Sequence, residues 1–160
     1  MDYKISLEDY NDTLQELMPM YRRAYEEMLG FIPEGLKRQG FDPWIEAYTL
    51  SNVEKTLLLF VVRKEEIAVG YCLMFVTRDL KDNTLMAYED YIYLEPGHRN
   101  GLGKYLAKFI ISELNARGIK RITVSVLKGT GLELVWSRLG FKVVATQMEL
   151  SLLVLLESIR

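Results

Sequence analysis

Three glycines and three basic residues lie close together in the stretch EPGHRNGLGK, from Glu95 to Lys104, between an apolar run and an amphipathic one. Glycine lets a ligand approach the backbone without a Cβ in the way, and the free N–H groups at the start of a helix favour an anion. The stretch therefore predicts a site for an anion, most simply a phosphate. The alternative is a glycine-rich turn that caps a surface helix, with Arg99 and Lys104 solvated.

The spacing in this stretch excludes two common phosphate-binding loops. A P-loop has four residues between its first glycine and the Gly-Lys pair, and Ser or Thr follows that pair. Here five residues intervene and Tyr105 follows the lysine. The dinucleotide fingerprint would need a third glycine at Leu106, after an early strand–helix–strand unit that this chain lacks.

Two carboxylates, Glu89 and Asp90, lie in the middle of the apolar run AYEDYIY. Charged side chains are rare inside such a strand, and neighbouring residues on a strand point to opposite faces. We expect one of the two carboxylates to face a cavity. The alternative is that it pairs with an arginine or caps a backbone amide.

Composition limits the class of protein. A length of 160 residues with 49% hydrophobic side chains suits one domain over 1–160. Twenty basic and 22 acidic residues give a net charge of −2, so no overall positive field favours nucleic acid or anionic lipid. Cys72 and His98 are the single cysteine and histidine, which excludes an internal disulfide and argues against a transition-metal site.

The N-terminal sequence, MDYKISLEDY, has no apolar signal region, and no apolar stretch is long enough to span a bilayer. We therefore expect a reduced, cytoplasmic protein without a membrane or nucleic-acid partner.

The order of elements indicates an α/β fold with a mixed sheet. A strand at Tyr3–Leu7 is followed by a helix over 11–30 that Pro19 should bend or divide, and by a short helix over 42–50. Three strands follow, of which the first two form a hairpin across a charged turn. The ranges of these strands are 56–63, 67–77 and 85–94. A helix over 101–117, a strand over 121–126, a helix over 130–140 and one or two strands within 141–156 complete the chain.

The loop resembles the signature of the GNAT superfamily of N-acetyltransferases, a basic or glutamine residue, two others and then Gly-x-Gly. The resemblance extends over roughly the whole chain, through LEP before the loop and VWSRLGFK near the end. HRNG and YEDYIYLEP look most like phage-encoded members. The resemblance implies a three-layer fold, with a mixed, mostly antiparallel twisted sheet of six to seven strands flanked by about four helices. It also implies an acetyl-CoA-dependent N-acetyltransferase.

The resemblance implies a set of residues for acetyl-CoA, the co-substrate. The pyrophosphate would meet the amides of Arg99, Asn100, Gly101, Leu102, Gly103 and Lys104, and pantetheine would pair with the backbone of Ile92, Tyr93 and Leu94. Counting back from Gly-x-Gly puts the signature residue at His98, whereas counting on from Pro96 puts it at Arg99. Arg99 and Lys104 add charge complementarity to the phosphates.

The resemblance also assigns catalytic roles. Asp90, or Glu89 if the strand register is reversed, is the expected base that removes a proton from the amine. The family's tyrosine acid falls on Trp136, which cannot usefully supply a proton, and its asparagine position falls on Gly129. The alternative is therefore a catalytically degenerate domain that binds acyl-CoA or another protein without efficient transfer.

The acceptor is expected to be an amine on a small molecule or a peptide. The family shapes its acceptor site between the first helices, so the aromatic candidates for substrate contact are Tyr25, Phe31, Trp44 and Tyr48, which could equally be core residues. The tail LSLLVLL either completes the sheet or pairs across a homodimer interface.

Overall fold

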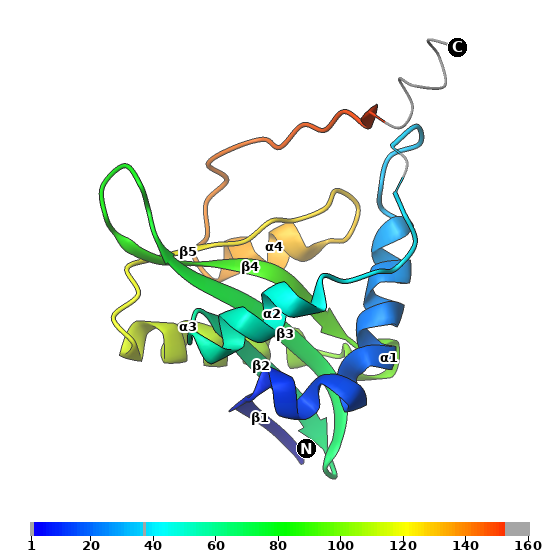
Figure 1. Cartoon of the computed structure of the whole chain (residues 1–160), viewed down its shortest axis with the longest axis vertical. Coiled ribbons are helices and arrows are strands. Elements are labelled where there is room, and N and C mark those ends of the chain that lie inside the picture. The colour runs from blue at the N-terminus through cyan, green and yellow to red at the C-terminus, as the bar shows by residue number, and fades with distance from the viewer. Residues whose placement is uncertain (1, 37, 153–160) are drawn as a thin grey trace. The chain divides into compact units, whose positions relative to one another are not determined.

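The computed structural model describes residues 2–36 and 38–152 of the chain (Figure 1). Its strands are β1 (Tyr3–Glu8), β2 (Leu57–Lys64), β3 (Ile67–Arg78), β4 (Leu85–Leu94) and β5 (Arg121–Thr123). Its helices are α1 (Tyr10–Leu29), α2 (Ile45–Val53), α3 (Leu102–Ala116) and α4 (Leu132–Arg138), with a 3₁₀ helix at Pro96–His98. Within these residues, no helix is both long and apolar enough to cross a membrane.

The chain gathers into two compact units. The sheet unit comprises residues up to Met20 and from Trp44 to Ser125, and the second unit comprises Tyr21–Pro43 and the residues from Val126 onward. The boundary falls inside α1, just after Pro19, yet the helix continues through this proline and is not divided by it. The prediction of one domain over 1–160 stays a prediction.

A mixed, mostly antiparallel sheet organises the sheet unit, as predicted. The strands lie in the order β1-β2-β3-β4-β5, antiparallel from β1 to β4, while β5 runs parallel to β4. The predicted hairpin joins β2 to β3 through Glu65 and Glu66, which have φ values of 49° and 67°. Two successive left-handed residues match the twist of a two-residue hairpin turn.

The predicted number of strands is wrong, because the sheet has five strands and not six to seven. The strand expected over 121–126 pairs with β4 only at Arg121–Thr123, which offers few hydrogen bonds for further strands to build on. Residues 141–151 form no strand, and apolar side chains such as Val144 and Met148 are exposed there. Residues 153–156 of the predicted terminal strands lie outside the described residues.

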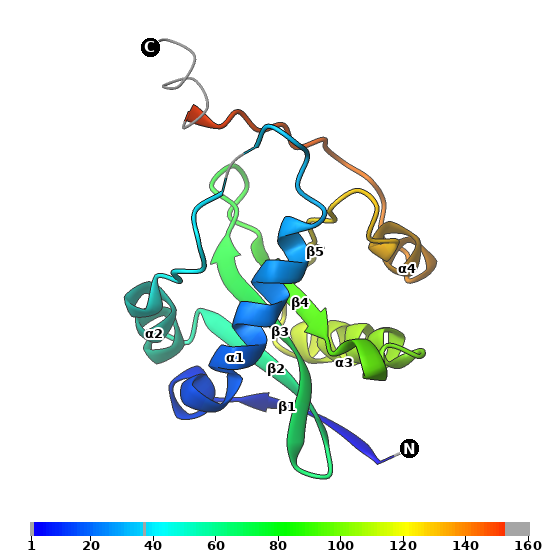
Figure 2. The same cartoon turned by 90° about the vertical axis from the view of Figure 1, so that its right-hand side faces the viewer.

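The main core fills the space between the sheet and α3. Leu102, Leu106, Ile110 and Leu114 recur at helical spacing, are buried, and pack with strand side chains such as Phe60, Cys72, Met74 and Ala87. Figure 2 shows α2 on the other side of the sheet. Tyr48 of α2 lies there, with its ring centroid 5.9 Å from that of Phe75 on β3. The two faces of β4 are therefore covered by different helices.

Two polar clusters fix the start of α1 against the sheet. Asp9 accepts a hydrogen bond from the amide of Asp12 (3.0 Å) and another from the side chain of Asn52 (3.1 Å), whose own oxygen accepts the amide of Tyr10. Aspartate before the first helical residue satisfies amides that lack an intrahelical partner. This cluster joins α1 to α2.

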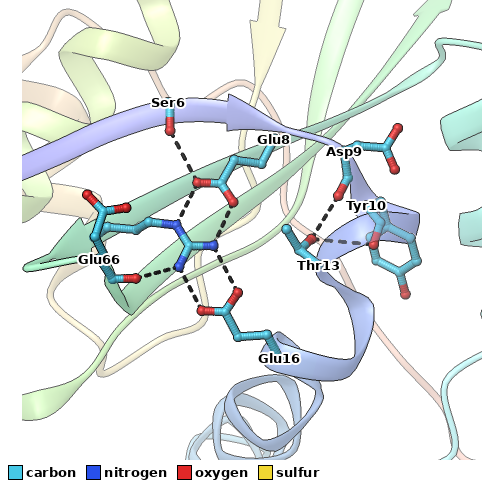
Figure 3. A network of polar contacts seen from close by, with 8 residues as sticks. Ser6, Glu8, Asp9, Tyr10, Thr13, Glu16 and Glu66 are labelled. Atoms are coloured by element: carbon cyan, nitrogen blue, oxygen red, sulfur yellow. Dashed lines mark hydrogen bonds and ion pairs between the residues drawn. The ribbon is translucent and has the colours of Figure 1, made fainter.

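The second cluster centres on Arg63 of β2 (Figure 3). Its guanidinium donates to both carboxylate oxygens of Glu8 and to both of Glu16, at 2.7 to 2.9 Å, and to the carbonyl of Glu66. These hydrogen bonds raise the pKa of Arg63 above its usual range. The partners of Arg63 lie on β1, on α1 and in the β2–β3 turn. We therefore assign this cluster to the stability of the packing between β1 and α1.

Candidate active site

The strand β4 contains an extra residue at Asp90. Leu73 of β3 faces Tyr91 and the next residue, Met74, faces Glu89, so Asp90 has no partner in the register. Such a bulge re-aims the side chains beside it and is common next to active sites. The bulge therefore gives the two predicted carboxylates different surroundings.

Asp90 lies on the α2 side of the sheet. The hydroxyl of Tyr48 donates a hydrogen bond of 2.7 Å to Oδ2 of Asp90. Desolvation by the surrounding side chains raises the pKa of Asp90, and this hydrogen bond partly offsets the effect. The pKa of Tyr48 is raised in turn, first by its own burial and then by the charge of Asp90. Asp90 is thus an exposed residue whose carboxylate is nonetheless partly desolvated by its neighbours.

Glu89 faces the α3 side, opposite Met74 of the main core. Burial, and then the charge of Asp90, raise the pKa of Glu89 to about 8. The thiol of Cys72 is buried, and its pKa is raised well above its usual value by burial and by both carboxylates. A thiol that keeps its proton is a poor nucleophile, so Cys72 packs as a small apolar side chain.

The outer edge of β4 opens just where these carboxylates lie. β5 pairs with β4 only from Met86 to Tyr88, and in the described part of the chain no strand pairs with this edge beyond Tyr88. The amide of Glu95 donates to Val69 on β3. Since backbone groups alternate in direction along an antiparallel strand, those of Tyr93 point to β3 and those of Ile92 and Leu94 point to the open edge.

The glycine-rich loop continues from this edge into α3. Gly101 is the residue before the helix, with φ 81° and no side chain that caps the helix. A Cβ at Gly101 would meet nothing within 4 Å, and one at Gly103 would meet only a methyl of Leu94 at 3.7 Å. The space above both glycines is therefore not filled by the described chain.

Two of the basic residues of the loop are held by the sheet unit. His98 shares a hydrogen bond of 2.9 Å between its Nδ1 and the hydroxyl of Tyr3 on β1. Arg99 donates from Nε to the carbonyl of Leu94 at 2.8 Å, and its guanidinium lies 5.5 Å from the ring centroid of Tyr93. Lys104 is exposed on the first turn of α3. The picture of a wholly solvated basic turn is therefore wrong for Arg99.

The second unit contains four more residues that the sequence singled out, which are Tyr25, Phe31, Gly129 and Trp136. Tyr25 donates its hydroxyl to the carbonyl of Gln39, and Phe31 lies beside Gly129, where a Cβ would come within 3.5 Å of its ring. Trp136 is only 5% exposed, and its indole N–H has no acceptor within the described residues. Of the four predicted aromatic contacts, Tyr48 and Trp44 belong to the sheet unit instead.

A model of the acetyltransferase (GNAT) family matches residues 14–141. The chain belongs to the GNAT family. Members of this family use acetyl-CoA as co-substrate for N-acetylation, so acetyl-CoA is the co-substrate of this chain. No curated protein matches it.

Solved structures share the GNAT fold over nearly the whole chain. A predicted acetyltransferase from Clostridium acetobutylicum, solved with acetyl-CoA, has a TM-score of 0.69 at 19% identity and covers 94% of this chain and 97% of its own. A GCN5-related N-acetyltransferase from Ralstonia eutropha has a TM-score of 0.72 at 16% identity, and the match covers 92% of this chain and 97% of that chain. An aminoglycoside acetyltransferase from an uncultured soil metagenomic sample has a TM-score of 0.66 at 18% identity, and the match covers 93% of this chain and 97% of that chain. These similarities concern the fold.

The loop of this GNAT domain fits the pyrophosphate of coenzyme A. No side chain caps the start of α3, which favours an anion there, and the open space at Gly101 and Gly103 allows close approach. Acetyl-CoA supplies the activated acetyl group when bound. The residues present are therefore suited to the co-substrate of the family.

The sequence did not indicate the aromatic surroundings of Asp90. Tyr10 and Phe75 are not among the residues that the sequence singles out. Their proximity comes from the pairing of β3 with β4 and from the packing of α1 against α2, which are long-range contacts. The only local signal was the high aromatic content of the run around Glu89 and Asp90.

Proposed function

We propose that the chain transfers the acetyl group of acetyl-CoA directly to a primary amine, with Asp90 as the base. The observation that carries the proposal is the bulge in β4. It places an exposed carboxylate, bonded to Tyr48 and without a basic partner among the described residues, where the edge of β4 becomes open.

The two carboxyl groups take different protonation states. The charge of Asp90 contributes to raising the pKa of Glu89, so Asp90 ionises first and Glu89 keeps its proton up to about pH 8. An ammonium acceptor must lose a proton before its lone pair can attack. Asp90 takes that proton, and the neutral amine attacks the carbonyl carbon of the thioester. The C–N bond forms as the C–S bond breaks, the nitrogen releases its second proton to solvent, and the thiolate of coenzyme A takes a proton from Glu89 or solvent.

The co-substrate is held by backbone groups of the loop and of β4. Amides of Arg99, Asn100, Leu102 and Gly103 would meet the pyrophosphate, with Lys104 adding a positive charge, whereas the amides of Gly101 and Lys104 already donate to the carbonyls of Arg99 and Gly101. Pantetheine would pair with the outward groups of Ile92 and the amide of Leu94, because the carbonyl of Leu94 already accepts Arg99. Tyr93 contributes its ring, which packs beneath Arg99, more than its backbone.

A domain that binds acyl-CoA without efficient transfer is the competing function. It is favoured by Trp136 and Gly129 at two positions where the family has a tyrosine and an asparagine. The test is release of free thiol from acetyl-CoA, measured with a panel of primary amines that includes a diamine, an aminoglycoside and a lysine peptide. Amine-dependent release supports the transferase. Tight acetyl-CoA binding without release above the hydrolysis rate supports the binding module.

We also propose that the chain forms a homodimer. The support is the cluster of exposed apolar side chains between residues 143 and 152, where Val144 is 87% and Met148 is 92% exposed. Large apolar side chains that recur on one exposed segment are typical of an interaction surface.

A further inference from the structure

We propose that Tyr3 is a positioning residue for coenzyme A, because it holds His98 and, through His98, the loop that meets the pyrophosphate. Tyr3 lies on β1, an edge strand of the sheet that is three strands away from β4. The inference rests on the proposed binding of the pyrophosphate by the glycine-rich loop. It adds a residue outside that loop, and it makes the side chain of His98 an anchor of the loop in place of a phosphate contact.

His98 is the inward-facing residue of an otherwise exposed stretch. Pro96, Gly97, Arg99 and Asn100 are exposed, whereas His98 is half-buried. A surface loop with few buried side chains moves easily unless a contact to the rest of the fold holds it. The side chain of His98 is therefore suited to fix where the amides that follow it point.

Tyr3 holds the imidazole of His98 in two ways. The hydroxyl of Tyr3 and Nδ1 of His98 share a hydrogen bond of 2.9 Å. The two rings also meet edge to face, with centroids 5.8 Å apart and an interplanar angle of 87°. The hydrogen bond fixes one atom of the imidazole and the edge-to-face contact fixes the plane of its ring. Together they specify both the position and the orientation of His98.

Tyr3 is itself fixed within the sheet unit. Its backbone pairs with Lys64 of β2, and its ring packs against the main core between the sheet and α3. The Nζ of Lys64 lies 5.9 Å from the centroid of the same ring. Tyr3 therefore offers the exposed loop a partner whose own place is set by the sheet.

The contact between Tyr3 and His98 crosses most of the sheet. β2 and β3 separate β1 from β4, and neighbouring strands lie about 4.8 Å apart, so β1 and β4 are about 14 Å apart. The loop begins this crossing at Glu95, whose amide donates to the carbonyl of Val69 on β3, and it reaches β1 at Tyr3. The placement of the loop thus depends on β1 as well as on the strand that precedes it.

The hydrogen bond should matter for binding because it favours one arrangement of the loop. When only a fraction of the protein has the arrangement that binds a ligand, the apparent Kd rises by the inverse of that fraction. One hydrogen bond between side chains changes the population of such an arrangement by up to about tenfold. Its loss should therefore weaken the binding of acetyl-CoA by about 3- to 10-fold.

Titrations of two probes at pH 7, followed by backbone amide chemical shifts, test the inference. Acetyl-CoA carries the pyrophosphate, whereas S-acetylpantetheine has the same acetylated arm without it. Tyr3→Phe keeps the ring and removes the hydroxyl, so it should weaken acetyl-CoA by about 3- to 10-fold and leave S-acetylpantetheine unchanged. Lys4→Gln is the matched control, because Lys4 is the exposed neighbour on β1 whose side chain points to the other face. It should bind both probes as the unaltered protein does.

Variants of His98 distinguish an anchor from a phosphate contact. His98→Asn places a polar atom near the position of Nδ1 but has no group at Nε2 and no positive charge, so it should keep most of the affinity for acetyl-CoA. His98→Leu should lose about as much affinity as Tyr3→Phe, and the double variant should lose no more than the weaker of the two, because both changes remove the same bond. His98 is the only histidine of the chain, so its imidazole signals are unambiguous and should shift in Tyr3→Phe.

Unchanged acetyl-CoA affinity in folded Tyr3→Phe, or equal losses for the two probes, would overturn the inference. Additive losses in the double variant, or a loss in His98→Asn as large as in His98→Leu, would also overturn it, because His98 would then contact the phosphate directly. Melting temperatures well above that of the titrations establish that each variant is folded.

Gly103→Val, titrated in parallel, separates this inference from the proposed function. If Gly103→Val keeps the full affinity for acetyl-CoA, the assignment of the loop is wrong and the role of Tyr3 is rejected with it. If Gly103→Val loses affinity while Tyr3→Phe does not, the assignment of the loop stands and only the role of Tyr3 is rejected. Losses in both variants, confined to acetyl-CoA in Tyr3→Phe, support both.

Discussion

Adjacent carboxyl groups on β4 face different surroundings because one extra residue interrupts the strand. Glu89 lies over the main core and holds its proton, whereas Asp90 accepts a hydrogen bond from the hydroxyl of Tyr48. Environments that separate the pKa values of two neighbouring acids also separate their chemical roles. The bulge is thus the local feature that makes one of them a base.

Replacing Asp90 with asparagine should remove the base and keep the fold. The amide oxygen can still accept the hydroxyl of Tyr48, so Asp90→Asn should lower kcat by about 10²- to 10⁴-fold at neutral pH with little change in coenzyme A binding. Higher pH should partly restore the rate, because the amine then loses its proton in solution. Steady-state kinetics from pH 7 to 10 measure this. Asp12→Asn, at an exposed position of α1, is the control.

Glu89→Gln should lower the rate less than Asp90→Asn does, since solvent can supply the proton to the thiolate. A larger loss in Glu89→Gln than in Asp90→Asn would exchange the two roles. Equal and negligible losses in both variants would reject a carboxylate base altogether.

The raised pKa of Glu89 also predicts how stability depends on pH. Between the ordinary value near 4.5 and the value of about 8, the folded state binds a proton that the unfolded state has lost. Stability from this group is therefore greatest below about pH 4.5 and falls as pH rises to about 8. Relative to Glu89→Gln, the unaltered protein should lose at most about 1.4 kcal/mol per pH unit over this window.

Urea unfolding at pH 5, 6.5, 8 and 9 measures that difference, because other titrating groups cancel between the two proteins. The groups that bear on Glu89 are the charge of Asp90 beside it and the neutral thiol of Cys72 behind it. Glu54→Gln, at an exposed position, should show no such trend. A difference that stays level from pH 5 to 9 would mean that Glu89 is ionised in the folded protein.

Single elements were largely predictable from the sequence, and the contacts between them were not. Leu102, Leu106, Ile110 and Leu114 specify one buried face of α3, and the β2–β3 hairpin follows from two apolar runs around a charged turn. Glu89 and Asp90 stood out because strands seldom carry charge. No local pattern specifies the bulge at Asp90, because a bulge is defined by the partner strand.

The junction between β4 and α3 gives a prediction about Gly103. Gly101 has φ 81°, so any other residue there would strain the folded protein, whereas a Cβ at Gly103 meets only a methyl at 3.7 Å. Gly103→Val should therefore leave the melting temperature of the free protein within a few degrees of its original value. It should block the approach of pyrophosphate to the start of α3.

Thermal unfolding with and without acetyl-CoA reads out that effect. A ligand that binds only the folded state at a hundredfold excess over Kd stabilises it by about 2.7 kcal/mol, and this shift should vanish in Gly103→Val. Lys108→Ala, one turn further along α3, should keep the full shift. If acetyl-CoA does not shift the melting temperature of the unaltered protein, the assignment of the loop is contradicted. If Gly103→Val keeps the full shift, the pyrophosphate does not bind at the start of α3.

On the scale of the molecule, the match to the GNAT family spans both compact units, while the proposed chemistry is concentrated in one. Asp90, Glu89, Tyr48 and the glycine-rich loop all belong to the sheet unit. The second unit holds Tyr25 and Phe31, together with the exposed segment that the sequence led us to expect as strands. A segment rich in apolar residues that lacks strand partners within its own described chain is suited to association with another molecule.

That segment gives the last prediction, a concentration-dependent dimer. Val143, Val144, Met148 and Leu150 are 69% to 92% exposed, and covering such side chains is favourable by about 25 cal/mol for each Å² of apolar surface removed from water. Light scattering after size-exclusion chromatography should show a mass near twice 18.6 kDa at high concentration, falling on dilution. Val144→Glu with Met148→Glu should shift the protein to monomer without lowering acetyl-CoA binding. Leu80→Glu, at a fully exposed apolar residue of the β3–β4 loop, should leave the dimer intact. A protein that stays monomeric at every concentration, or a dimer that Leu80→Glu disrupts as readily, would show that residues 143–152 do not form the interface.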